Sequence, residues 1–131
     1  MIFVDANVPM YLIGKAHPNK VRARVLLDQC VAGSERLVTD AEVLQEILHR
    51  YVAIDRRDAV QPAYDTLLAV VDHVFPVTRE AVIRAHHLAV GIHRLSARDA
   101  LHVAVMQAEG ITRILTFDGD YDSIQGIERV R

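Results

Sequence analysis

Two acidic residues stand where local structure should bring them close together. Asp99 follows Ser96 by three residues, the spacing of a capping box in the first turn of a helix, and Gly110 is suited to end that helix. Residues 111–117 then form a short apolar run that leads directly into Asp118. A helix packed beside a parallel strand would place Asp99 and Asp118 at the same edge of a sheet.

Further acids follow two other predicted strands. Asp5 ends the apolar run at the start of the chain, and Glu42 and Glu46 lie one and two turns into the helix after a second strand. Carboxylates gathered without matching Lys or Arg repel one another, and a hard divalent cation such as Mg²⁺ relieves that conflict. Such an ion could activate a water molecule and stabilise charge on a phosphoryl group.

Each acid also has a purely structural interpretation. Asp residues at strand ends are common turn formers, and Asp99 could serve only as a capping-box member. Thr39 stands three residues before Glu42, so a second capping box is expected there. Glu46 has no capping role and lies on the flank of its helix, which makes it a better ligand candidate than Glu42.

Two histidines share helix faces with acids. Glu46 with His49 and Asp99 with His102 are both acid-x-x-His pairs, which face the same way on a helix. Paired Glu-x-x-His motifs would suggest a di-iron helical bundle, but the strand patterns of this chain disfavour an all-helical architecture. We therefore expect His49 and His102 to be partly buried, hydrogen-bonded residues beside the acidic cleft.

Strand patterns alternate with helix patterns along the whole chain. Strands are expected over residues 2–5, 36–39, 73–77, 111–117 and 127–130, and helices over 8–13, 21–33, 40–52, 57–72, 79–90 and 97–109. This alternation predicts a single α/β domain over residues 1–131, with a mostly parallel sheet flanked by helices on both faces.

Composition limits the classes of function. Net charge is −2, which neither supports nor excludes an RNA partner once metal-ligating acids are set aside. Cys30 is the only cysteine, so intrachain disulfides and thiolate metal clusters are excluded, and we expect it to be buried. No apolar run approaches the ~20 residues of a membrane span. A cytoplasmic protein without a membrane segment is expected.

Four segments together resemble the PIN-domain family, and in particular the VapC-type toxins of bacterial toxin–antitoxin pairs. They are Val4–Asn7, Thr39–Tyr51, Leu95–Ala104 and Thr116–Asp118. The resemblance covers essentially the whole chain. It implies a three-layer α/β sandwich and an endoribonuclease that depends on Mg²⁺ or Mn²⁺. It also implies a homodimer and a cognate antitoxin that blocks the site.

The resemblance also assigns roles to residues. The family's metal-binding and catalytic acids fall on Asp5, Glu46, Asp99 and Asp118, with Glu42 as the rival of Glu46 and Asp122 as a possible outer ligand. Thr116 matches a small hydroxyl position near the metal. Ala6 is a departure, because many members carry Ser or Thr there and this chain lacks that hydroxyl.

Two further expectations concern partners. Arginines near the cleft, Arg98 among them, would position RNA phosphates. An antitoxin would press an apolar segment against the short helix Pro9–Ile13 and reach the acids with an Arg. Alternatively, Met10, Tyr11 and Leu12 belong to the hydrophobic core.

The alternative function is a PIN-like module that binds RNA or protein without cutting. An intact set of four acids disfavours it.

Overall fold

A single parallel sheet lies at the centre of the computed structural model, which describes residues 1–131. Its strands are β1 (Ile2–Val4), β2 (Leu37–Asp40), β3 (His73–Phe75), β4 (Arg113–Leu115) and β5 (Glu128–Arg129). They lie in the order β3-β2-β1-β4-β5, and every neighbouring pair is parallel. The chain therefore builds outward from β1 to β3, then crosses to the other side of β1 for β4 and β5.

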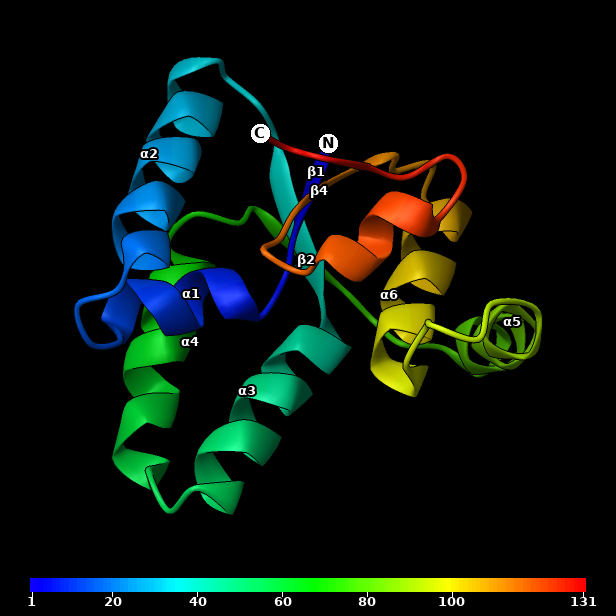
Figure 1. Cartoon of the computed structure of the whole chain (residues 1–131), viewed down its shortest axis with the longest axis horizontal. Helices are drawn as coiled ribbons and strands as arrows, with labels where there is room; N and C mark the ends of the chain where they lie inside the picture. The colour runs from blue at the N-terminus through cyan, green and yellow to red at the C-terminus, as the bar shows by residue number, and fades with distance from the viewer.

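Helices cover both faces of this sheet (Figure 1). One side carries α1 (Asn7–Ile13), α2 (Pro18–Ala32) and α4 (Val60–Leu68), and the other carries α5 (Arg79–Gly91) and α6 (Ala97–Ala108). Helix α3 (Ala41–Ala53) continues from the carboxyl end of β2 and contacts both α4 and α6. Two short 3-10 helices, η1 (Arg57–Ala59) and η2 (Gly119–Ser123), complete the chain. The predicted three-layer α/β sandwich is confirmed.

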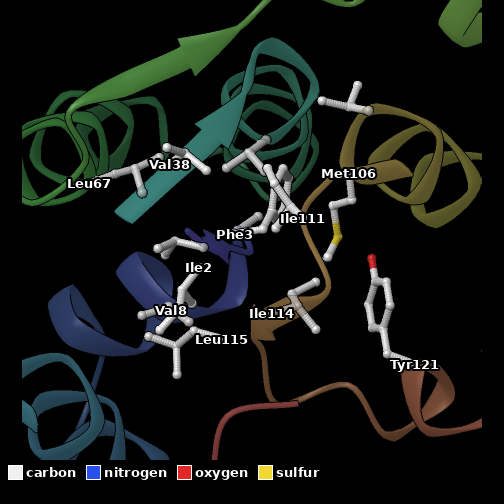
Figure 2. Close-up of a cluster of buried hydrophobic side chains, with 14 of the residues drawn as sticks. Ile2, Phe3, Val8, Val38, Leu67, Met106, Ile111, Ile114, Leu115 and Tyr121 are labelled. Carbon is white, nitrogen blue, oxygen red and sulfur yellow. The ribbon is translucent and has the colours of Figure 1, made fainter. Parts of the chain in front are cut away.

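The strands are apolar because both of their faces are covered. Ile2, Phe3 and Val4 are fully buried, as expected for a central parallel strand between two helical layers. Figure 2 shows the side chains of β1 and β4 meeting Val8 on one side and Met106 on the other. This core fixes the carboxyl ends of the strands, where the acidic residues begin.

Helix caps follow the sequence closely, with one correction. Ser96 and Thr78 each accept a hydrogen bond from the backbone N–H three residues on, as predicted N-caps do. The prediction that Thr39 caps α3 is wrong. Asp40 is the N-cap and accepts from the N–H of Val43 at 2.9 Å. Thr39 remains in β2, where its hydroxyl donates to the carbonyl of Val4 at 2.8 Å.

Several helices and strands begin or end at other residues than the sequence predicted. Helix α2 begins at Pro18, inside the loop expected before residue 21, because His17 caps it and Pro is well suited to a first helical position. The single helix expected over residues 57–72 is instead η1 followed by α4, with Pro62 in the first turn of α4. Strand β4 is shorter than the apolar run over residues 111–117, because only residues 113–115 of that run pair with β1.

Three other predictions can be compared directly with the structure. Cys30 is buried and free, as expected. None of the helices combines the length and the apolar character that crossing a membrane requires. Gly110 has a φ of +69°, the left-handed conformation predicted for the residue that ends α6.

The N-cap of α5 offers a test of the fold away from the acidic residues. Thr78→Ala removes the hydroxyl that accepts from Ala81 N–H at 3.1 Å and should lower the free energy of unfolding by about 1 kcal/mol. Urea denaturation would measure it. Thr66→Ala, inside α4, is the matched control and should change stability by no more than about 0.5 kcal/mol. Equal effects of the two substitutions would contradict the capping role.

Candidate active site

An acidic cleft opens at the carboxyl ends of β1 and β4, where the strand order reverses. Ligands of open α/β sheets bind at such a switch point, because the loops after the two strands diverge there. The cleft is lined by Asp5, Ala6, Asn7, Met10, Glu46, Arg50, Arg98, Asp99 and Asp118. All four acids predicted to bind metal therefore share one cleft, opposed by two arginines. A larger hollow beside α5, lined in part by Glu80, Arg84 and His87, has no comparable set of carboxylates.

Asp5 is held rigidly at the bottom of this cleft. Its Oδ1 accepts from the N–H of Ala6 at 2.7 Å, and its Oδ2 accepts from the hydroxyl of Thr116 at 2.7 Å. Burial raises the pKa of Asp5 to about 6, against the opposing effects of the His102 charge and the Thr116 hydrogen bond. A buried carboxylate with oriented donors and a raised pKa is typical of a functional position.

Thr116 joins three residues of the cleft. Besides donating to Asp5, its hydroxyl accepts from the side-chain amide of Asn7 and from the N–H of Asp118, both at 3.1 Å. The family resemblance predicted a small hydroxyl near the acids at this position. The Thr116 hydroxyl fixes the side chain of Asp5 directly and fixes Asp118 through its backbone N–H.

Asp99 and Asp118 both sit at the first turn of a helix. The N–H of Asp99 donates to Ser96, as predicted, but its carboxylate accepts from the hydroxyl of Tyr121 at 2.9 Å. Burial raises the pKa of Asp99, and the neighbouring Asp118 charge raises it further, while the Tyr121 bond lowers it. Asp118 caps η2 by accepting from the N–H of Asp120 at 2.9 Å.

Glu46, and not Glu42, reaches the cleft. Its Oε1 lies 3.6 Å from Nη1 of Arg98. Burial would raise the pKa of Glu46, but the proximity of His102 and Arg98 holds it below its ordinary value. Glu42 stands one turn earlier and does not line the cleft. The prediction that Glu42 belongs to a capping box is wrong, because Asp40 replaces Thr39 as the cap.

His102 lies beneath the acids and is fully buried rather than partly so. Its Nδ1 is 2.9 Å from Oδ2 of Asp40, while its Nε2 faces Glu46 Oε2 at 3.5 Å and Asp5 Oδ1 at 3.9 Å. Burial would lower the pKa of His102, but the carboxylates of Asp40, Glu46 and Asp5 raise it well above its ordinary value. The imidazole ring thus offsets part of the negative charge from below.

Asp40 is a fully buried acid next to the cleft that the sequence analysis did not single out. It is an acid at the end of β2, as Asp5 is at the end of β1, and that parallel was the available signal. One other prediction is wrong here: His49 is exposed rather than partly buried. Asp122, the possible outer ligand, does not line the cleft. Its carboxylate accepts from Arg129 at 2.7 and 2.8 Å and from Arg131 at 3.2 Å.

The donor set of the cleft suits a divalent cation. Oxygen atoms of four carboxylates face one space, which is what Mg²⁺ and Mn²⁺ prefer. Carboxylate oxygens of Asp5 and Glu46 lie within 4.8 Å of each other, close enough to share one ion. Oε2 of Glu46 and the facing Nε2 of His102 are buried 3.5 Å apart, and neither makes a hydrogen bond in the structure, so this carboxylate oxygen is available to a cation. The residues present therefore fit such an ion.

The raised pKa of Asp5 predicts how stability depends on pH. Because its pKa rises from 3.8 to about 6 on folding, the folded protein holds this proton more tightly than the unfolded chain. That stabilisation is complete below pH 3.8 and is lost as the pH rises through 6. Metal-free Asp5→Asn protein should match the parent near pH 4 and be more stable at pH 7, by up to about 3 kcal/mol. Urea denaturation in chelator at several pH values would measure it, and a pH-independent difference would contradict it.

Comparison with known proteins assigns the family. A family model described as PIN domain matches residues 2–127. The chain is 55% identical over 130 residues to Ribonuclease VapC13 of Mycobacterium tuberculosis, with 99% of each chain covered. It is 43% identical over 121 residues to Ribonuclease VapC23 of the same species, with 90% of this chain and 93% of that one covered.

Solved structures agree in fold. The chain is 27% identical to M. tuberculosis VapC20, a sarcin–ricin loop cleaving toxin, with a TM-score of 0.81 over 100% of this chain and 99% of that one. The toxin–antitoxin complex VapBC2 of Rickettsia felis, bound to a DNA fragment from its promoter, gives a TM-score of 0.70 at 16% identity, with 100% of each chain covered. The chain therefore belongs to the PIN-domain family and, within it, to the VapC ribonucleases.

Proposed function

We propose that this chain is a metal-dependent endoribonuclease and the toxin of a toxin–antitoxin pair. The observation that carries the proposal is the gathering of Asp5, Glu46, Asp99 and Asp118 in one cleft at the switch point of the sheet. These four carboxylates would hold Mg²⁺, for which Mn²⁺ could substitute. When bound, the ion supplies Lewis-acid activation of water and neutralises charge at the scissile phosphate.

The chain's own residues would prepare this reaction. Thr116 and the N–H of Ala6 fix Asp5, and Tyr121 fixes Asp99, so these carboxylates need little reorganisation. Arg50 and Arg98 line the cleft, where they would bind the phosphates of an RNA strand and orient the scissile bond. Since the VapC20 relative cleaves the sarcin–ricin loop, ribosomal RNA is the first substrate to test. We also propose that the protein works in the cytoplasm as a homodimer, as the family resemblance implies.

The metal requirement and the ligand set can be tested together. Purified protein should cleave ribosomal RNA with Mg²⁺ or Mn²⁺ and lose that activity in excess EDTA. Glu46→Gln removes a charge that the ion needs and should lower the cleavage rate on the order of 100-fold. Glu42→Gln is the matched control one turn away, outside the cleft, and should leave the rate nearly intact.

Three results would contradict the proposal in different ways. Undiminished cleavage in EDTA would exclude the metal mechanism. A larger loss from Glu42→Gln than from Glu46→Gln would reverse the ligand assignment. RNA binding without cleavage under all metal conditions would favour the alternative, a PIN-like module that binds RNA or a protein partner without cutting.

The surface beside the cleft suits an antitoxin. Val8 and Pro9 of α1 are buried in the core, but Met10, Tyr11 and Leu12 are only half-buried, and Met10 lines the cleft. We propose that a cognate antitoxin covers these apolar side chains and places an Arg among the acids, because a guanidinium pairs with carboxylates in a fixed geometry.

The role of that Arg can be measured in the complex. Each arginine of the co-purified antitoxin would be replaced by Ala in turn, and one replacement should restore RNA cleavage to the toxin while the complex persists. Native mass spectrometry would confirm that the two chains remain bound. An antitoxin that still inhibits when every arginine is replaced would rule out this mode of inhibition.

A further inference from the structure

Tyr121 is a buried tyrosine whose only polar atom is directed at an acid of the cleft. Its side chain is fully buried, and its hydroxyl donates to Oδ1 of Asp99 at 2.9 Å. Figure 2 shows the ring standing on the turn after β4, with its hydroxyl pointing toward α6, the helix that carries Met106 and Asp99. A buried phenol needs a hydrogen-bond partner, and here that partner is a carboxylate expected to bind metal.

The turn that carries Tyr121 also carries Asp118. Asp118 begins η2 as its N-cap, and Tyr121 lies three residues later, so one short turn fixes two acids of the cleft. Through Thr116 the same segment is tied to Asp5. The far end of the turn is held by Asp122, which pairs with Arg129 and Arg131 of the C-terminal segment.

Packing alone does not account for a tyrosine at this position. Phenylalanine would fill the same volume and would leave no hydroxyl to satisfy. The hydroxyl orients Asp99, which stands in the first turn of α6 and has several rotamers open to it. With Oδ1 engaged by Tyr121, the carboxylate of Asp99, which lines the cleft, is restricted in its orientation.

We propose that Tyr121 is a positioning residue that holds Asp99 in the orientation required to bind the divalent ion. This inference rests on the proposed function, since Asp99 is taken as a ligand there. Hydrogen-bonding partners of metal ligands commonly contribute on the order of 10-fold to metal affinity, because they keep the ligand oriented before the ion arrives. Tyr121 would act through Asp99 and would not touch the RNA.

The chain offers a matched pair of variants. Tyr121→Phe removes the hydroxyl bonded to Asp99, and Tyr64→Phe removes a hydroxyl that donates to the carbonyl of Leu44, also at 2.9 Å, outside the cleft. Both lose one tyrosine hydrogen bond and keep their ring. Mn²⁺ binding to RNA-free protein, followed by electron paramagnetic resonance, should weaken on the order of 10-fold in Tyr121→Phe and remain unchanged in Tyr64→Phe.

The Mn²⁺ dependence of cleavage gives a second measurement, which would not change if Tyr121 had only a structural role. Tyr121→Phe should need on the order of 10-fold more Mn²⁺ for half-maximal activity, and saturating Mn²⁺ should restore most of the rate. If Tyr121→Phe proves too unstable to purify, Asp99→Asn in the same chain should rescue folding, because it removes the carboxylate that lost its donor. Instability that does not arise from the Asp99 carboxylate would not be rescued.

Three outcomes decide the matter. Equal Mn²⁺ affinity in the parent and Tyr121→Phe, with cleavage intact in both, would overturn this inference and leave the proposed function standing. A parent that neither binds Mn²⁺ nor cleaves RNA would overturn both. Instability of Tyr121→Phe that Asp99→Asn fails to relieve would show that the hydroxyl does not act through Asp99 and would overturn this inference.

Discussion

Repulsion among the carboxylates of the cleft is the constraint on which the rest of the structure depends. Four acids share this space with two arginines, so the fold must hold them together in the absence of a cation. It does so with donors that come from beneath the acids: Thr116 to Asp5, Tyr121 to Asp99, and the imidazole of His102 beside Asp5 and Glu46. Burial raises the pKa values of Asp5 and Asp99, and the neighbouring charges of Glu46 and Asp118 raise them further, so the donors compensate the negative charge only in part. An incompletely compensated set of acids is prepared to bind a cation.

The strand order explains how residues far apart in sequence come to share the cleft. Because β1 has β2 on one side and β4 on the other, the segments that follow β1 and β4 open away from each other. Asp5 and Asp118 follow these two strands, and α3 and α6 bring Glu46 and Asp99 to the same opening. The buried core of β1 and β4 keeps the strand ends fixed, so the acids are positioned by regular elements rather than by long loops.

The sequence predicted the four cleft acids and the layered parallel fold, because both depend on local patterns such as apolar runs and capping spacings. Contacts between segments that lie far apart in the chain could not be predicted from such local patterns. The hydrogen bonds of Asp40 with His102 and of Tyr121 with Asp99 join residues 62 and 22 positions apart. Local chemistry was also ambiguous between Thr39 and Asp40, since either can cap a helix. The hydrogen bond of Thr39 to Val4 across the sheet decided between them. The ligand roles of the acids stay predictions.

Asp40 shows that the fold and the cleft share the same interactions. Its Oδ1 accepts from the N–H of Val43 and starts α3, the helix that carries Glu46. The same carboxylate orients His102, which belongs to α6 and lies beneath Glu46 and Asp5. Since Asp40 is fully buried, its carboxylate depends on both partners for its hydrogen bonds. The start of α3 and the imidazole under the acids therefore form one unit, and the position of Glu46 relative to Asp5 is set by a residue that does not line the cleft.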